Sequence, residues 1–446
     1  MTARWPVIVL ACAACGDNLA PHDDLFTPVS GARLALQKYR YDDGTEQAVA
    51  GELYDTELHV RCTPQLAADG ALRCVPVADD AAYLDPACTA RVGLGRTIAR
   101  PTHFVVHEDR PEGSVARVFR AGAAIAPITQ YYLASAAGCA GPTPVPPELT
   151  SFFEVGDEVE SGALVAFHDG ELGAGRLGLV VRQTDDGARV AIGMRDHELG
   201  VACAPRLQAD GSAACEPLAA QPVTGFSDPA CRELAVAVDA GAPPALVKAV
   251  EPSGCASYHA LGLELSTPLY RRDGDACTAV ATPAGGRVFS VDAALALAAL
   301  GRAPEDAPRR RLRRIVLTRD DLRFADDRLF DSAAGADCEH RTLRSVIRCV
   351  PVNVATATTL YADDCATQLR VAEVPNRTCE PLAYATSNRP FQIRALGAPV
   401  AAALFQLDGS GCHPYAPAPG NELRELGPPL DPATFVGAIY YSERAQ

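Results

Sequence analysis

Short segments of alternating or β-branched apolar residues recur along the whole chain. Leu177, Leu179 and Val181 alternate with Gly178 and Val180, and a period of two is typical of a β-strand with one buried face. Asp-Gly pairs separate many of these segments, and this dipeptide favours the tight turn of a β-hairpin. The pattern therefore predicts a protein made mainly of short strands and hairpins.

One segment has a different pattern. Residues 293–300 consist only of Ala and Leu, follow Asp292 and precede Gly301. Aspartate is a preferred N-cap residue, and glycine commonly ends a helix. These residues are therefore predicted to form a short helix.

A long sequence unit occurs three times. In each copy an aspartate precedes a first cysteine at a constant spacing, and a second cysteine follows the first at an almost constant spacing. The three copies follow one another at nearly equal intervals, so the chain is built of internal repeats. The repeated residues are Asp55, Cys62 and Cys74; Asp196, Cys203 and Cys215; and Asp331, Cys338 and Cys349.

The repeats predict the fold class and the domain boundaries. Each unit of about 140 residues holds about eight strand-like segments, enough for two four-stranded sheets. An all-β fold is expected, as a six-bladed β-propeller with two blades per repeat, because radial repetition protects sheet edges. Tandem β-sandwiches are the alternative. We place the three repeats at 31–170, 171–308 and 309–446.

The N-terminal residues have the order of a secretory signal. Arg4 precedes a short apolar run, and small residues with two cysteines follow. A cysteine after small residues resembles the lipobox of bacterial lipoproteins, so we expect residues 1–14 to be a signal peptide and Cys15 to carry lipid. Residues 15–30 are polar and turn-rich, as in a flexible tether. Cys12 is the alternative lipidation site, and a cleaved signal without lipid is a further alternative.

Fourteen cysteines remain after Cys12 and Cys15. Exported proteins fold in an oxidising compartment, where cysteines at repeated spacing predict disulfides. The gaps do not match structural zinc sites. We expect hairpin disulfides Cys62–Cys74, Cys203–Cys215 and Cys338–Cys349, second pairs Cys231–Cys255 and Cys365–Cys379, and, by elimination, Cys88–Cys139 and Cys277–Cys412.

The charge and the motifs limit the possible functions. The chain has 55 acidic and 40 basic residues, a net charge of −15, and such a charge repels nucleic-acid phosphates. The sequence has no H-E-x-x-H, no G-x-S-x-G and no Walker loop. We therefore predict no nucleic-acid partner, no cofactor and no catalytic residue.

Two groups of residues could bind a metal ion. His103 and His107 are four residues apart, which places both on one face of a strand; an exposed pair is the alternative. Asp55, Asp196 and Asp331 could converge near a symmetry axis and hold calcium, or each could accept hydrogen bonds at a turn. We favour the alternative in both cases. The basic run at 309–314 is expected to be a solvated linker between repeats.

The start Cys15-Gly16-Asp17-Asn18, with the repeated D-G-x-x-x-C-x-P and D-P-A-C patterns, resembles uncharacterised cysteine-repeat lipoproteins of myxobacterial type. The resemblance covers nearly the whole mature chain and implies no activity, ligand or catalytic residue. The first unit departs from the other two because it lacks their fourth cysteine.

These observations predict an exported protein held to the membrane by an N-terminal lipid. We expect an outer-membrane lipoprotein of the cell envelope, facing the periplasm or the exterior, or a secreted protein. It would act as a disulfide-stapled β scaffold that binds a polymer or an envelope protein, without catalysis. The alternatives are an extracellular hydrolase or lyase with its site at the propeller axis, and a purely structural envelope component.

Overall fold

The computed structural model describes residues 25–443, except for short stretches at 96–100, 111–112, 136–137, 148, 150, 209–211, 240, 242, 251–254, 274–275, 283–284, 344, 353, 363–364, 376–381, 389–390, 410 and 419. In the described part the fold is all-β, as predicted. The only helical elements there are two single 3₁₀ turns, η1 (Ser161–Ala163) and η2 (Pro432–Thr434). No helix in this part of the chain is long and apolar enough to cross a membrane.

The largest sheet, here called the central sheet, has fifteen strands in the order β12-β13-β14-β15-β16-β25-β26-β27-β28-β29-β37-β1-β2-β3-β4. Most neighbours in this sheet are also neighbours in the sequence. Its strands are β1 (Leu34–Tyr41), β2 (Glu46–Asp55), β3 (Val60–Leu66), β4 (Leu72–Pro76), β12 (Phe167–Leu172), β13 (Leu177–Thr184), β14 (Arg189–Asp196), β15 (Val201–Leu207), β16 (Ala213–Pro217), β25 (Ala299–Pro304), β26 (Leu312–Arg319), β27 (Leu322–Asp331), β28 (Ala336–Leu343), β29 (Val346–Pro351) and β37 (Gly437–Ser442).

The two ends of the central sheet meet. Arg73 on β4 forms a backbone bridge with Ala166, which precedes β12, and the amide of Cys74 donates to the carbonyl of Val165 at 2.9 Å. Equivalent bonds occur in the other repeats, where the amide of Cys215 donates to the carbonyl of Ala298 at 2.9 Å and that of Cys349 to the carbonyl of Val436 at 3.0 Å. The sheet is therefore a closed ring in which each repeat supplies the same five-strand pattern.

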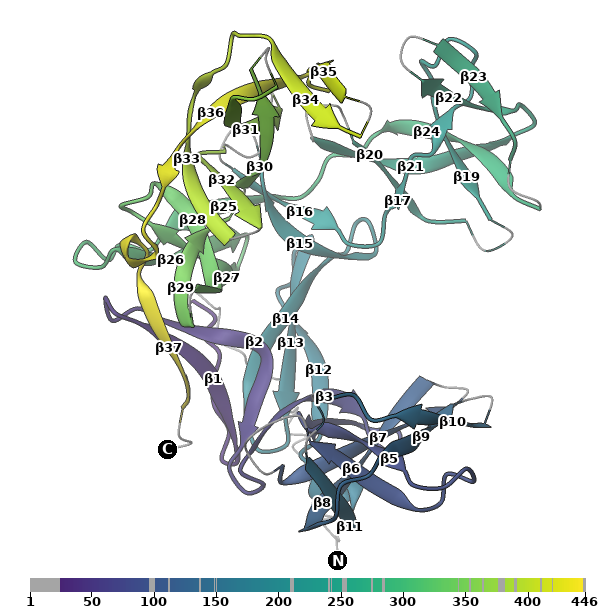
Figure 1. Cartoon of the computed structure of the whole chain (residues 1–446), viewed down its shortest axis with the longest axis vertical. Helices are drawn as coiled ribbons and strands as arrows, with labels where there is room; N and C mark the ends of the chain where they lie inside the picture. Colours follow the sequence, from purple (N-terminus) through teal and green to yellow (C-terminus); the bar gives the residue numbers. More distant parts are fainter. Residues whose placement is uncertain are drawn as a thin grey trace, which may run out of the picture.

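Each repeat also forms one small barrel outside the ring, and the three outer barrels project from the central sheet in Figure 1. Their strand orders are the same when β17 and β18 are taken as one interrupted strand. The first outer barrel has β5 (Asp79–Tyr83), β6 (Arg91–Gly95), β7 (His103–Arg110), β8 (Gly113–Ala124), β9 (Gln130–Ser135), β10 (Gly138–Pro144) and β11 (Ser151–Val159); the second has β17 (Gln221–Pro222), β18 (Gly225–Phe226), β19 (Leu234–Val238), β20 (Leu246–Val250), β21 (Ala256–Leu265), β22 (Leu269–Asp273), β23 (Ala276–Val280) and β24 (Arg287–Ala294); the third has β30 (Val354–Tyr361), β31 (Gln368–Pro375), β32 (Tyr384–Asn388), β33 (Phe391–Pro399), β34 (Leu404–Asp408), β35 (Gly411–Tyr415) and β36 (Asn421–Pro429).

The ring is filled by three hydrophobic clusters, each made by strands of two successive repeats. The cluster between repeats two and three contains Leu179, Met194 and Phe324. The other two lie between repeats one and two and between repeats three and one. Each cluster contains one buried hairpin disulfide, so these disulfides join the core of the ring.

The described disulfides include four of the expected pairs: Cys62–Cys74, Cys203–Cys215, Cys338–Cys349 and Cys88–Cys139. Three expected pairs, Cys231–Cys255, Cys365–Cys379 and Cys277–Cys412, are wrong, because the structure has Cys231–Cys277 and Cys365–Cys412 instead. Cys255 is also disulfide-bonded, and Cys379 lies outside the described residues.

The observed pairs Cys231–Cys277 and Cys365–Cys412 follow from the position of a hairpin in each outer barrel. In the third barrel, β34 pairs beside Tyr361, at the end of β30, and Cys365 follows a few residues later. Cys412 lies on the partner strand β35. The fold thus brings Cys412, on the second strand of the hairpin, to Cys365. The same arrangement recurs at β22 and β23 in the second barrel.

Two further expectations are wrong. Residues 293–300 form no helix, because β24 runs to Ala294 and β25 begins at Ala299. The four sheets have fifteen, seven, eight and seven strands, so they form neither six four-stranded blades nor a simple row of sandwiches. Blades or separate sandwiches do not form because the hydrogen bonding of the central sheet continues across the repeat boundaries.

Candidate functional site

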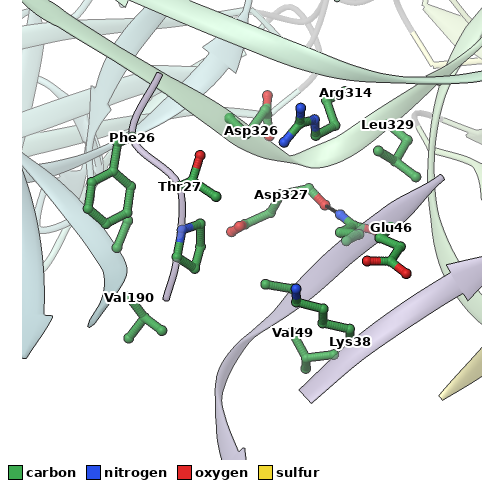
Figure 2. A pocket seen from close by; sticks show the side chains of 15 residues that line it. Phe26, Thr27, Lys38, Glu46, Val49, Val190, Arg314, Asp326, Asp327 and Leu329 are labelled. Atoms are coloured by element: carbon green, nitrogen blue, oxygen red, sulfur yellow. Dashed lines mark hydrogen bonds between the residues drawn. The ribbon is translucent and has the colours of Figure 1, made fainter. Parts of the chain in front are cut away.

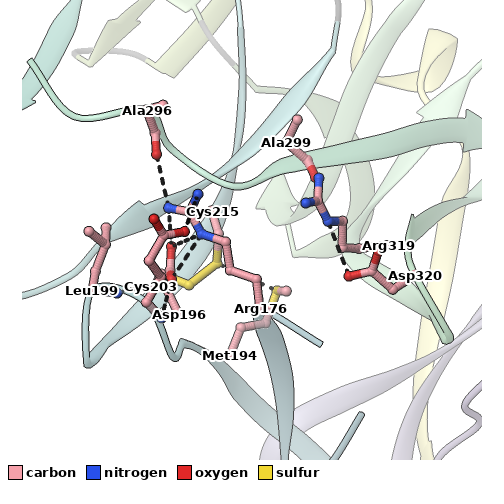
Figure 3. Close-up of polar contacts among 11 residues, drawn as sticks. Arg176, Met194, Asp196, Leu199, Cys203, Cys215, Ala296, Ala299, Arg319 and Asp320 are labelled. Carbon is pink, nitrogen blue, oxygen red and sulfur yellow. Dashed lines mark hydrogen bonds and ion pairs between the residues drawn. A yellow bond between two sulfur atoms is a disulfide. The ribbon is translucent and has the colours of Figure 1, made fainter. Parts of the chain in front are cut away.

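The repeated aspartates are buried and bound by arginines. Asp196 is 0% exposed, and its carboxylate accepts hydrogen bonds from the Nη2 of Arg176 at 2.9 Å and from the amides of Glu198 and Leu199 at 3.0 and 3.2 Å. Figure 3 shows this group beside the Cys203–Cys215 disulfide. The aspartate therefore fixes the turn that follows β14.

The other two repeats have the same contacts. Asp55 binds Arg33 at 2.6 Å, and Asp331 binds Arg311 at 2.7 Å. Both aspartates also accept bonds from the amides two and three residues later. Each aspartate thus serves its own repeat, as the favoured interpretation predicted, and no group of three or more His, Cys, Asp or Glu residues in the described part is placed to hold a metal ion.

Two of the three arginines also hold the chain where it returns from an outer barrel. Nη1 of Arg33 donates to the carbonyl of Ala163, and Nη2 of Arg176 donates to the carbonyl of Ala296, both at 2.9 Å. These arginines lie 22 and 20 residues before their aspartates. The recurring Arg and Asp spacing was a signal that sequence reasoning missed.

The remaining candidates have separate surroundings. His103 is 4% exposed, and its Nδ1 lies 3.0 Å from the Thr102 hydroxyl; burial lowers its pKa. His107 is exposed and lies 4.0 Å from Asp80. The basic run is not a solvated linker, because its residues from 312 onward belong to β26. Cys12 and Cys15 lie outside the described residues.

The N-terminal segment crosses the ring between two repeats. We call residues 25–30 the strap. The amide of Phe26 donates to the carbonyl of Arg323 on β27 at 2.7 Å, and Val29 and Arg189 on β14 exchange two backbone bonds of 2.9 Å. The guanidinium of Arg189 lies 5.2 Å from the centre of the Phe26 ring. The strap therefore joins repeats two and three.

A cavity of about 190 Å³ lies beside the strap. Strands of all three repeats line it: β1 and β2, β14, and β26 and β27. Figure 2 shows Phe26, Val49, Val190 and Leu329 on its apolar walls. We call it the central cavity, because it lies where the three repeats and the strap meet.

Four of the charged side chains that line the central cavity have partners. Lys38 binds Glu443 at 2.7 Å, Glu46 binds Arg40 at 2.8 Å, Arg314 binds Glu305 at 2.8 Å, and Asp326 binds Arg328 at 2.9 Å. These pairs compensate the four lining charges. One further lining residue, Asp327, differs from them.

The carboxylate of Asp327 has no hydrogen bond or ion pair among the described residues. Its main-chain carbonyl accepts a bond from Gln47, and in Figure 2 its carboxylate points into the cavity. Asp327 is exposed, yet desolvation by the surrounding protein and the charge of the neighbouring Asp326 raise its pKa, against the opposing effects of Arg328 and His340. A carboxylate that lies in a cavity without a hydrogen-bond partner can bind a cation or a hydrogen-bond donor.

Sequence reasoning missed Asp327 because it is not repeated. Asp327 lies four residues before the repeated Asp331, and the equivalent positions of the other repeats hold Gly51 and Ile192. The signal was therefore a departure from the repeat: a charged residue where the equivalent positions are uncharged. Asp326 and Asp327 are adjacent on a strand, and Figure 2 shows them pointing to different sides.

A model described as "Family of unknown function (DUF7481)" matches residues 8–435 of the chain. No curated protein matches the sequence, and no solved structure matches the fold. The matching family therefore implies no activity for this chain.

Proposed function

Since the chain belongs to the DUF7481 family of unknown function, we propose from its geometry that it is an exported binding protein of the cell envelope, held to the membrane by lipid on Cys15. The single observation that carries the binding role is Asp327. It is a carboxylate without a described partner in the central cavity, whereas the three repeated aspartates are all bound by arginine.

The disulfides support the location. Six are described, two in each repeat, and structural disulfides indicate an oxidising compartment.

The architecture suits binding. A closed ring with three disulfides in its core keeps the walls of the central cavity in place, and a preformed site loses little conformational entropy when a ligand binds. The three outer barrels project from the ring (Figure 1) and present surfaces for a larger partner.

The rival function is an extracellular hydrolase. Glycoside hydrolysis, for example, commonly needs two carboxyl groups that face the scissile bond from opposite sides. In the central cavity Asp326 is bound to Arg328 and Glu46 to Arg40, which leaves one carboxylate of the described lining without a described hydrogen bond or ion pair. This arrangement favours binding over acid and base catalysis.

A non-reducing peptide map of the protein from its native membrane tests the proposal. We expect a lipid on Cys15 and the six described disulfides. The same protein applied to arrays of envelope polymers and proteins should bind without turnover. An unmodified N-terminus with several free thiols would contradict the location, and turnover lost on substitution of Asp327 would favour the hydrolase.

A further inference from the structure

The charges around the central cavity do not balance. Two basic and three acidic side chains line it, and four of these five are bound to neighbours, as described above. The fifth, Asp327, leaves one negative charge without a described partner. A single positive charge on a ligand would complete the lining.

The walls and the size of the central cavity limit the ligand. Phe26, Val49, Val190 and Leu329 give it apolar sides, so a ligand gains by burying apolar surface. Its volume of about 190 Å³ exceeds the roughly 150 Å³ of a cavity that holds benzene. A molecule of about the size of one ring with a short charged arm therefore fits.

A metal ion fits this lining less well. Calcium takes six to eight oxygen ligands, whereas the described lining offers one carboxylate that is not already paired. No cluster of three or more metal-ligating side chains occurs in the described part of the chain. The apolar walls have no role around a hydrated metal ion, but they match the carbon skeleton of an organic cation.

We propose that the central cavity binds a small organic monocation, a primary amine or a guanidine, with Asp327 as its counter-ion. The ammonium or guanidinium donates charge-assisted hydrogen bonds to the carboxylate, and its carbon part packs between the strap and the walls formed by β2, β14 and β27. The proposal rests on the proposed binding function and names its ligand class.

The strap forms part of the proposed binding site. Phe26, Thr27 and Pro28 form one wall of the central cavity. Phe26 and Thr27 also line a second cavity of about 280 Å³, formed with β13 and β27. The strap thus separates two cavities, and a ligand beside Asp327 contacts the segment that leads back to the N-terminus.

Isothermal titration of the full mature chain with benzylamine tests the proposal, with benzamidine as a guanidine-like cation and benzyl alcohol as a neutral compound of similar shape. We expect both cations to bind and benzyl alcohol to bind at least 10-fold more weakly, since a hydrogen bond to a charged group contributes roughly a 10-fold to 100-fold difference. Equal binding of benzylamine and benzyl alcohol, or no binding of any probe at 10 mM, would overturn the proposal.

Two variants identify the carboxylate. Asp327→Asn keeps the shape and removes the charge, and it should weaken benzylamine binding at least 10-fold while leaving benzyl alcohol unchanged. Asp109→Asn removes one charge from an exposed position on β7 and should change neither. An equal loss in both variants would show that net charge alone attracts the probes and would refute a specific site.

The wild-type comparison of benzylamine with benzyl alcohol decides the question even if Asp327→Asn fails to fold. It is also independent of the proposed function. If the polymer arrays show binding and the peptide map shows lipid, but the cations do not bind, only the ligand class is wrong. If cations bind at Asp327 and the N-terminus carries no lipid, the site stands and the anchor fails.

Discussion

Replacing Asp196 with Ala removes the centre of one of the three repeated arginine clusters. The carboxylate is fully buried, and the guanidinium of Arg176 is 20% exposed. The change removes the bonds from Nε and Nη2 of Arg176, at 3.1 and 2.9 Å, and from two turn amides. It leaves the guanidinium with only the exposed Glu198 as a counter-ion, at 2.8 Å, and the turn without its acceptor.

The structure sets the size of the effect. Removing one partner of a buried ion pair costs about 3–5 kcal/mol. Because Arg176 is partly exposed, solvent recovers some of this energy, and Arg176 keeps a bond to the carbonyl of Ala296 at 2.9 Å. We expect Asp196→Ala to lower the free energy of unfolding by about 3 kcal/mol, within the range for a broken buried network.

Urea unfolding with the disulfides oxidised measures this cost. Circular dichroism is the suitable probe, because the only tryptophan, Trp5, lies in the predicted signal peptide. Asp109→Ala, at an exposed position on β7, is the matched control and should change the free energy of unfolding by no more than about 0.5 kcal/mol.

A double-mutant cycle isolates the pair. Arg176→Met combined with Asp196→Ala should show a coupling energy of about 2 kcal/mol. Substitution of Asp55 or Asp331, which have the same contacts, should cost about the same as substitution of Asp196. If Asp196→Ala costs no more than the exposed control variant, or if the coupling energy is near zero, these aspartates do not hold the fold.

Three more predictions concern a disulfide, the strap and the cavity. Replacing Cys203 and Cys215 with Ser opens a loop with a sequence separation of 12 and should cost about 3 kcal/mol in urea unfolding; an unchanged midpoint would contradict this. In Gly31→Ala the new Cβ would lie 2.3 Å from the Asp186 carboxylate, so limited proteolysis should cut the strap faster than in wild type, and equal rates would argue against it. Burial raises the pKa of Asp327 in the folded state, so protonation stabilises the fold, and this contribution is lost as the pH rises through the folded pKa. Asp327→Asn should therefore have a higher Tm than wild type at pH 7, by a margin that shrinks towards pH 4; a lower Tm at pH 7 would show a structural role.

Some of the architecture follows from spacing alone. Two nearby cysteines in strand-like segments, such as Cys62 and Cys74, form a hairpin disulfide because the turn between them brings both strands together. Across β3 and β4, Cys62 pairs with Pro76, and Pro64 with Cys74. The repeated aspartates were also predictable as acceptors at turns, since a residue needed three times serves the repeat.

Other features depend on long-range folding. The Ala and Leu run that predicts a helix instead joins the sheets, because the amide of Leu295 donates to the carbonyl of Tyr258 at 2.7 Å and the carbonyl of Ala298 accepts from Cys215 at 2.9 Å. These bonds to distant strands override the local preference for a helix. The ring itself could not be predicted, because its closure depends on which repeat ends meet.

The second set of disulfides was predictable in only one repeat. Cys88 had no nearby partner in the first unit, so elimination gave Cys139. In the other units a closer cysteine suggested a local pair, but Cys231 bonds Cys277 at the corresponding separation of 46 residues. The first repeat, which lacks the extra cysteine, therefore had the disulfide pairing that all three repeats share.

A crystal structure of the mature chain soaked with benzylamine shows whether an organic cation binds at Asp327 in the central cavity. We predict one benzylamine in the central cavity, its nitrogen about 3 Å from a carboxylate oxygen of Asp327 and its ring against Phe26 and Val190. Benzylamine bound only elsewhere, or only water beside Asp327 at a concentration that saturates binding in solution, would show that Asp327 is not the counter-ion of an organic cation.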